Sequence, residues 1–130
     1  METAGTTPTK SSKVMWAYDD RDLLWLMTRT LRRDGITVTT FDHAPTCREI
    51  VKEHPAVLFL DVDLGDANGA DVCDRLKRDQ IGASIPVVLV SAQSPDKLRD
   101  TALACRADGY ITKPFLPDHI VQLAKQYAQL

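Results

Sequence analysis

The sequence predicts a single three-layer α/β domain, in which helices cover both faces of a doubly wound parallel sheet. Five short apolar segments rich in β-branched residues alternate with segments of helical periodicity, a pattern typical of this class. Three of the five are almost continuously apolar, as parallel strands covered on both faces usually are. The 130 residues amount to about one domain, and no linker or change of composition divides them.

The expected strands have clear limits in the sequence. In chain order they occupy residues 14–18, 36–41, 57–60, 86–90 and 109–112. A helix is expected after each strand. In the first helix, apolar residues recur at the helical spacing of Leu24, Met27 and Leu31, and Asp34-Gly35 ends the helix.

The remaining helices are predicted mainly from the residues at which they begin. The second and third are expected over 45–53, with Pro45 at the first position, and over 69–79. The fourth begins at Ser94-Pro95-Asp96, which supplies an N-cap, a first-turn proline and an acid in sequence. The fifth begins at Pro117. Its expected inward-facing residues are Ile120, Leu123, Ala124 and Tyr127.

Composition and charge exclude several classes of protein. The 16 basic and 18 acidic residues give a net charge of −2, whereas a non-specific nucleic-acid-binding protein needs a basic excess. No apolar run approaches the ~20 residues that span a membrane. Residues 1–12 lack the apolar segment of a secretory signal. We therefore expect a flexible polar leader over 1–12 and a cytoplasmic domain over 13–130, which contacts neither nucleic acid nor membrane.

The cysteine spacing predicts neither a zinc site nor a disulfide framework. Cys47, Cys73 and Cys105 are 26 and 32 residues apart, so we interpret them as small residues on helices in a reducing compartment. The 3 histidines are scattered, and the glycine motifs of nucleotide-binding loops are absent from the sequence.

Polar side chains follow four of the five expected strands. Asp19 and Asp20 follow the first, Asp61 the third, Ser91 the fourth and Lys113 the fifth. The carboxyl ends of parallel strands meet at one edge of the sheet, where ligand sites form. A single aspartate after a strand is usually a turn former or helix cap, but converging carboxylates repel one another unless a cation lies between them. We therefore predict a Mg²⁺ site, since this ion binds few carboxylates and several waters.

Asp61 is the best-placed nucleophile of this set, because it follows a central strand. Its attack on a phosphorus atom would form an aspartyl-phosphate. Mg²⁺, Lys113 and the Ser91 hydroxyl would then share the phosphoryl oxygens, which is the main requirement of phosphoryl transfer.

The chain resembles the receiver domain of response regulators, the phospho-accepting part of two-component signalling. The residues that carry this resemblance, within roughly 13–130, are Asp19-Asp20, Asp61, Gly69, Ser91-Ala92 and Lys113-Pro114-Phe115. The resemblance implies a flavodoxin-like fold with a five-stranded parallel sheet in the order 2-1-3-4-5. It also implies a signalling protein rather than an enzyme, one that catalyses only its own phosphorylation and dephosphorylation.

The resemblance also implies roles for the acidic residues. Asp61 would be the phosphoacceptor, taking the phosphoryl group from a histidine kinase or a phosphotransfer protein. Asp20 and Asp61 would bind Mg²⁺ directly, and Asp19 would bind it through water. The backbone carbonyl of Asp63 would be a further ligand.

Three further residues are implied to bind the phosphoryl group or to respond to it. Ser91 and Lys113 would hold the phosphoryl oxygens, and the Lys113–Pro114 bond would be cis. Tyr110 would be the switch aromatic, which turns inward when Ser91 moves. This movement would change the face formed by the fourth helix, the fifth strand and the fifth helix, which would act on a downstream effector that the sequence does not identify.

The chain departs from the family pattern in three places. Gly65 stands four residues after Asp61, where a proline is common, so that loop is expected to be looser. Trp16 and Tyr18 occupy a first strand that usually ends in small aliphatic residues. Asp63 is an acid at a variable position that often influences phosphoryl lifetime.

Two alternative functions remain open from the sequence. Asp61-Val62-Asp63 also resembles the DxD motif of haloacid-dehalogenase-type phosphohydrolases, but there the DxD comes first, whereas here it follows Asp19-Asp20. The other alternative is a degenerate receiver that binds partners without phosphate, although the complete acceptor set argues against it. The sequence fits a free-standing regulator and a part of a longer protein equally well.

Overall fold

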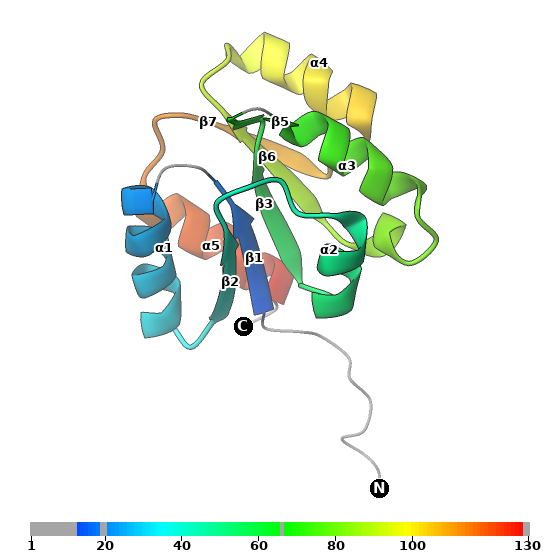
Figure 1. Cartoon of the computed structure of the whole chain (residues 1–130). Helices are drawn as coiled ribbons and strands as arrows, with labels where there is room; N and C mark the ends of the chain where they lie inside the picture. The colour runs from blue at the N-terminus through cyan, green and yellow to red at the C-terminus, as the bar shows by residue number, and fades with distance from the viewer. Residues whose placement is uncertain (1–12, 19–20, 66, 129–130) are drawn as a thin grey trace, which may run out of the picture.

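Five parallel strands form the centre of the computed structural model, which describes residues 13–18, 21–65 and 67–128 (Figure 1). Their spatial order is β2-β1-β3-β6-β7. This is the implied order 2-1-3-4-5, because β6 and β7 are the fourth and fifth strands of the sheet. The strands are β1 (Lys13–Ala17), β2 (Thr37–Phe41), β3 (Val57–Asp61), β6 (Val87–Ser91) and β7 (Gly109–Thr112). The expected leader, 1–12, lies outside the described residues.

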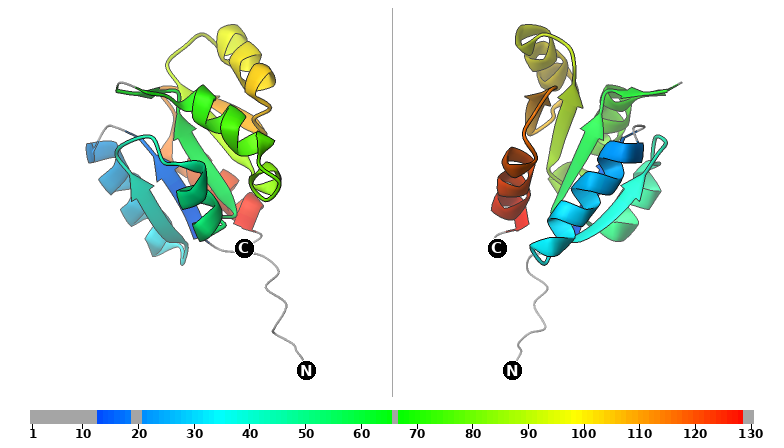
Figure 2. Two further views of the ribbon diagram at one scale, coloured as in Figure 1. Left: turned by 45° about the vertical axis from the view of Figure 1, so that its right-hand side comes forward. Right: turned by 90° about the vertical axis from the view of Figure 1, so that its left-hand side faces the viewer.

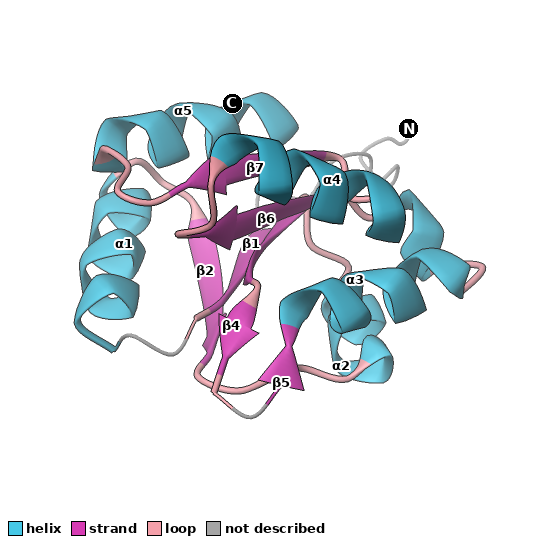
Figure 3. Cartoon of the chain, turned by 90° about the horizontal axis from the view of Figure 1, so that it is seen from above, coloured by secondary structure: helices cyan, strands magenta, loops and turns pink. Residues whose placement is uncertain are grey.

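Helices cover both faces of this sheet, which confirms the three-layer architecture (Figure 3). On one face lie α1 (Arg21–Arg33) and α5 (Pro117–Ala128). On the other lie α2 (Cys47–Glu53), α3 (Gly69–Arg78) and α4 (Pro95–Cys105). Within the described residues, no helix has the length and apolar character needed to cross a membrane. The three cysteines are free. They lie on α2, α3 and α4, which confirms their predicted location on helices.

The side chains of each strand alternate between two hydrophobic clusters. In β1, Val14 and Trp16 pack toward α1 and α5, whereas Met15 and Ala17 pack toward the opposite helices. β3 and β6 are buried over their whole length. Their nearly continuous apolar sequence is therefore explained by helices on both faces.

The central strands extend one residue further than the sequence predicts. β3 includes Asp61 and β6 includes Ser91, and parallel pairing places Asp61 opposite Val90. Both polar residues therefore occupy the last position of a buried strand. The pairing of the backbone at that position fixes the Cα atom of each residue.

The beginning of α2 differs from the prediction. The helix begins at Cys47 rather than Pro45, because Thr46 is its N-cap. The Thr46 hydroxyl accepts a hydrogen bond from the N–H of Glu49 at 3.1 Å, and the Glu49 carboxylate accepts one from the N–H of Thr46 at 2.9 Å. This reciprocal pair is a capping box, which fixes the first turn.

The four residues of α5 that are predicted to face inward all pack on one hydrophobic cluster, but they are buried to different extents. Ile120 and Ala124 are buried as expected, but Leu123 and Tyr127 are only half-buried at the edge of the cluster. The other buried positions of this helix are Val121 and Ala128.

A short hairpin that the sequence does not predict connects β3 to α3. Its strands are β4 (Asp63–Leu64) and β5 (Ala67–Asn68), which pair in antiparallel fashion (Figure 3). Gly65 follows β4 with a φ of 74°, in the left-handed region that favours glycine. The residues on either side of the loop are paired, and the expectation of a looser loop at Gly65 stays a prediction.

Gly69 begins α3 where the backbone passes close to the end of β3. A Cβ atom at this position would collide with the backbone carbonyl group of Asp61. The N–H of Gly69 also donates to the carbonyl of Val62 at 2.8 Å, which holds the two segments together. A residue with a side chain therefore requires a backbone shift directly beneath Asp61.

We predict that Gly69→Ala lowers the free energy of unfolding by about 1 to 3 kcal/mol, the usual cost of inserting an extra carbon into a packed region. Gly109→Ala is the matched control, because a Cβ atom there would meet only ordinary contacts at 3.7 and 3.9 Å. Urea unfolding of both variants measures the difference. Equal stability of the two variants would contradict the proposed collision.

Candidate functional site

Asp61 is buried at the carboxyl end of β3, with 1% of its surface exposed. Its Oδ1 accepts a hydrogen bond from the backbone N–H of Asp63 at 3.0 Å, and its Oδ2 accepts one from Nζ of Lys113 at 3.1 Å. Buried carboxylates are stable only when they are paired in this way. The structure therefore brings Asp61 and Lys113 together, as the strand ends predict.

Lys113 follows β7 and is held by its backbone as well as by its side chain. Its N–H donates to the carbonyl of Ser91 at 2.8 Å, and the Lys113–Pro114 bond is cis, as the resemblance implies. Its Nζ lies over the ring of Tyr18, 4.2 Å from the ring centroid. The ammonium group is thus located between a carboxylate and an aromatic face.

These contacts affect the charge of Lys113. Burial of the ammonium group acts to lower the pKa of Lys113, but the side-chain hydrogen bonds with Tyr18 and Asp61, together with the charge of Asp61, outweigh burial and raise this pKa above its ordinary value. Lys113 is therefore a cation at neutral pH, which is the form that binds phosphoryl oxygens.

Ser91 ends β6 and is buried, with 6% of its surface exposed. Its hydroxyl oxygen accepts a hydrogen bond from the N–H of Gln93 at 3.1 Å. Since its carbonyl accepts the N–H of Lys113, Ser91 is connected both to the lysine and to the segment that leads into α4. Ser91, Asp61 and Lys113 therefore share one edge of the sheet.

Asp63 lies in the β4–β5 hairpin, with its side chain exposed and its backbone N–H donating to Asp61. The backbone of Asp63 thus lies next to the Asp61 carboxylate, and its role as a metal ligand stays a prediction.

Asp19 and Asp20 lie outside the described residues. β1 precedes them and runs beside β3, with Ala17 opposite Leu60. The chain therefore leaves β1 at the edge where β3 ends in Asp61. In the described part of the chain, which lacks both positions, no three His, Cys, Asp or Glu residues are close enough to hold a metal.

Tyr110 lies in β7 with 41% of its surface exposed. It borders a groove of about 450 Å³, which is also lined by Pro95 of α4, by Phe115 just before α5 and by His119 in the first turn of α5. In this structure the predicted switch residue therefore faces outward, at the surface between α4 and α5.

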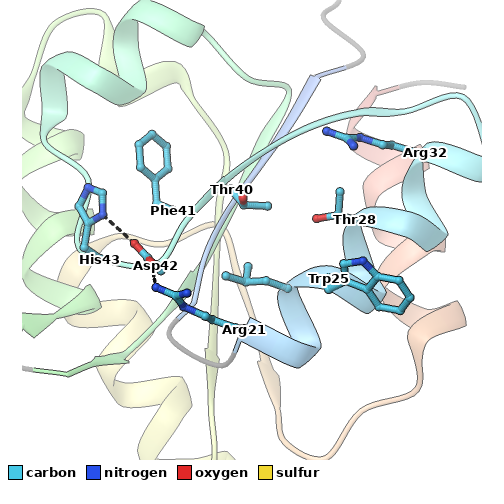
Figure 4. Close-up of a pocket in the computed structure, with 9 residues that line it drawn as sticks. Arg21, Trp25, Thr28, Arg32, Thr40, Phe41, Asp42 and His43 are labelled. Atoms are coloured by element: carbon cyan, nitrogen blue, oxygen red, sulfur yellow. Dashed lines mark hydrogen bonds and ion pairs between the residues drawn. The ribbon is translucent and has the colours of Figure 1, made fainter.

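A second groove, of about 540 Å³, lies between α1 and β2, which are neighbours in Figure 2. Figure 4 shows its polar contacts: Asp42 bridges Arg21 and His43, with both distances 3.1 Å. None of the predicted phosphoryl-binding residues lines this groove. The chemistry of the Asp61 site, rather than the size of a surface groove, therefore identifies the candidate functional site.

Tyr18 is the residue of this site that sequence reasoning missed. By its sequence, Tyr18 is a departure from the small aliphatic residues that usually end the first strand, yet its ring contacts Lys113. The signal was the alternation along the first strand, which gives Tyr18 the same face as Trp16. The distance to Lys113, however, depends on tertiary packing.

Sequence comparisons identify relatives of the chain. The model of the response regulator receiver domain family matches residues 14–125. The transcriptional regulatory protein CssR of Bacillus subtilis is 29% identical over 112 residues, covering 86% of this chain and 49% of that protein. The transcriptional regulatory protein PrrA of Mycobacterium tuberculosis is 31% identical over 126 residues, covering 96% and 52%. The chain thus spans about half the length of these curated relatives.

A solved structure with a similar fold is the BeF3-activated N-terminal receiver domain of RstA from Klebsiella pneumoniae. It aligns with a TM-score of 0.78 at 22% identity, covering 91% of this chain and 99% of that one. At this level of identity the likeness supports the fold alone. The family match, by contrast, includes every strand of the sheet except the first residue of β1, together with Asp61 and Lys113. We conclude that the chain belongs to the response regulator receiver domain family, whose members accept a phosphoryl group in two-component signalling.

Proposed function

We propose that Asp61 is the phosphoacceptor of this receiver domain. It would take the phosphoryl group from a histidine kinase or a phosphotransfer protein. The observation that carries the proposal is the contact between the buried Asp61 carboxylate and Lys113, at the carboxyl edge of the sheet. Among the described residues, Asp61 and Ser91 are the buried polar ones, and both belong to this edge. The same contact supports the acceptor role over a phosphate-independent binding role.

In the proposed reaction, the phosphoryl group moves from a nitrogen of the donor to an oxygen of Asp61. An oxygen of the Asp61 carboxylate forms a bond to phosphorus while the bond between phosphorus and the donor nitrogen breaks. Negative charge then lies on the phosphoryl oxygens, which Lys113 and the Ser91 hydroxyl would hold. The hydrogen bond between the Lys113 N–H and the Ser91 carbonyl keeps these two groups adjacent.

The donor atoms present at this edge suit Mg²⁺. This ion prefers oxygen ligands and keeps several waters, and the Asp61 carboxylate offers such a donor next to residue 63, whose N–H donates a hydrogen bond to it. We propose the backbone carbonyl of Asp63 as a further oxygen ligand. We propose Asp20 as a further direct ligand and Asp19 as a ligand through water. When bound, Mg²⁺ would neutralise part of the charge that the phosphoryl group brings.

The proposed response begins at Ser91. A phosphoryl group on Asp61 gives the Ser91 hydroxyl a stronger acceptor. Movement of Ser91 would break the hydrogen bond from Gln93, just ahead of Ser94, the N-cap of α4. Pro95 borders the groove in which Tyr110 lies, so this displacement would open space for the ring of Tyr110. The surface of α4, β7 and α5 would then present a changed face to an effector.

We also propose that the domain acts in the cytoplasm and does not itself bind nucleic acid or a membrane. The net charge of −2 supports this, since a nucleic-acid surface needs a basic excess.

We predict Mg²⁺-dependent phosphorylation by acetyl phosphate that Asp61→Asn abolishes, because the amide cannot act as the nucleophile. Intact-mass measurement should show one added phosphoryl group in the wild type and none after chelation of Mg²⁺. Asp118→Asn is the matched control, since it makes the same change at an exposed aspartate in the first turn of α5. Full labelling of Asp61→Asn, or labelling that chelation leaves unchanged, would refute the acceptor role.

We predict that Ser91→Ala still accepts phosphate but loses most of its response in α4 and β7, because no hydroxyl reaches the phosphoryl group. Hydrogen exchange with and without a phosphoryl mimic measures this response. Ser84→Ala, at an exposed serine on a short 3₁₀ helix, is the control. If Ser91→Ala responds like the wild type, the hydroxyl does not connect the site to that surface.

We predict that Asp63→Asn lengthens the lifetime of the phosphoryl group by up to about 10²-fold, the range for one general-base contact. Residue 63 contacts Asp61 through its backbone N–H, and its exposed carboxylate would accept a proton from the attacking water. Loss of phosphate from both proteins in excess Mg²⁺ provides the measurement. Faster loss in the variant would mean that charge repulsion dominates at this position.

A further inference from the structure

We propose that Tyr18 is a positioning residue for Lys113. Its ring holds the ammonium group where it reaches both Asp61 and a phosphoryl group bound to Asp61. The inference rests on the proposed role of Asp61 as phosphoacceptor, and it assigns a function to a residue outside the acceptor set that the strand ends predict.

The contact geometry is that of a cation–π pair. Nζ of Lys113 lies 4.2 Å from the centroid of the Tyr18 ring and 3.1 Å from Oδ2 of Asp61. A cation within about 6 Å of a ring centroid is attracted by the negative face of the ring, more strongly where water is excluded. Tyr18 is 4% exposed and the Lys113 side chain 27% exposed, so water is largely excluded from the contact.

The position of the Tyr18 ring is fixed by aromatic packing beneath it. Trp16 lies on the same face of the sheet, and its ring centroid is 6.2 Å from that of Tyr18 in an edge-to-face arrangement. Trp16 also packs on Phe59 with centroids 4.7 Å apart. The backbone N–H of Tyr18 donates to Phe41 at 3.0 Å, which holds the end of β1 against β2.

The same indole ring anchors the segment that carries Lys113. Phe115, two residues after Lys113, lies with its ring centroid 6.3 Å from that of Trp16. Trp16 therefore contacts both Tyr18 and the chain just beyond Lys113. One contact fixes the Tyr18 ring, and the other fixes the backbone next to Lys113. Together they fix the distance between the ring and the ammonium group.

The ring contact persists during a reaction in which the ion pair changes. When Asp61 accepts the phosphoryl group, one carboxylate oxygen becomes the bridging oxygen of an acyl phosphate, and negative charge moves outward to the phosphoryl oxygens. Asp61 then attracts Lys113 less, whereas the Tyr18 ring attracts it as before. Lys113 therefore stays within reach of the phosphoryl oxygens instead of turning to solvent. An aliphatic side chain at position 18 cannot provide this attraction.

The test compares two variants. Tyr18→Phe keeps the ring and removes the hydroxyl, with its hydrogen bond to Lys113, whereas Tyr18→Leu removes both. We expect the kcat/KM for phosphorylation by acetyl phosphate to be within about twofold of wild type for Tyr18→Phe. For Tyr18→Leu we expect a fall of about tenfold, mainly in kcat, as for a contact that acts in the transition state. Trp25→Leu is the matched control, because it removes another cation–π pair, with Arg29 at 5.2 Å, on the exposed side of α1.

A spectroscopic measurement separates positioning from a merely structural role. Protons that lie over an aromatic face have NMR signals shifted upfield. The terminal methylene protons of Lys113 should show this shift in the wild type and in Tyr18→Phe, and should lose it in Tyr18→Leu. If Tyr18→Leu does not fold, the wild-type spectrum alone tests whether Lys113 lies over the ring. Unshifted Lys113 signals in the wild type would overturn the proposal.

Other outcomes have defined meanings. Wild-type kinetics in Tyr18→Leu would overturn the positioning role, and so would an equal loss in Tyr18→Phe, which would assign the effect to the hydroxyl. Asp61→Asn is measured in parallel. Labelling that persists in Asp61→Asn refutes the acceptor assignment, whereas labelling that needs Asp61 but not the Tyr18 ring refutes only the present inference.

Discussion

The pairing of a buried carboxylate with a lysine is the constraint on which the rest of this site depends. Asp61 ends a strand that is buried on both faces, so its charge is stable only with a cationic or hydrogen-bonding partner at the same depth. Lys113 provides that partner from another strand end, and its backbone bond to Ser91 brings the hydroxyl to the same edge. The strand order is what makes this meeting of distant residues possible.

The sequence predicts those features that depend on strand ends. Asp61, Ser91 and Lys113 follow apolar segments, and the carboxyl ends of parallel strands share an edge, so their proximity follows from the fold class. The β4–β5 hairpin could not be predicted in this way, because two-residue strands have no apolar periodicity. α2 begins two residues later than the sequence predicts, because the reciprocal hydrogen bonds of Thr46 and Glu49 outweigh the preference of Pro45 for a first turn.

Tyr18 illustrates a different limit of sequence reasoning. Strand alternation assigns its face, but the contact with Lys113 also needs the Phe115 segment to pack on Trp16. Such packing joins residues about a hundred positions apart, and no local pattern in the chain encodes it. A residue that departs from the family pattern thus becomes part of the site through the core that supports it.

The two tryptophans occupy opposite environments, and this gives the molecule an internal optical probe. Trp16 is 1% exposed and packs against Tyr18, whereas Trp25 is 62% exposed on α1. Indole fluorescence shifts to shorter wavelength in an apolar environment, so the emission of this protein consists of a blue component from Trp16 and a red component from Trp25. A dissolved quencher such as iodide reaches only the exposed indole. The emission that remains in its presence comes from the core directly beneath the lysine.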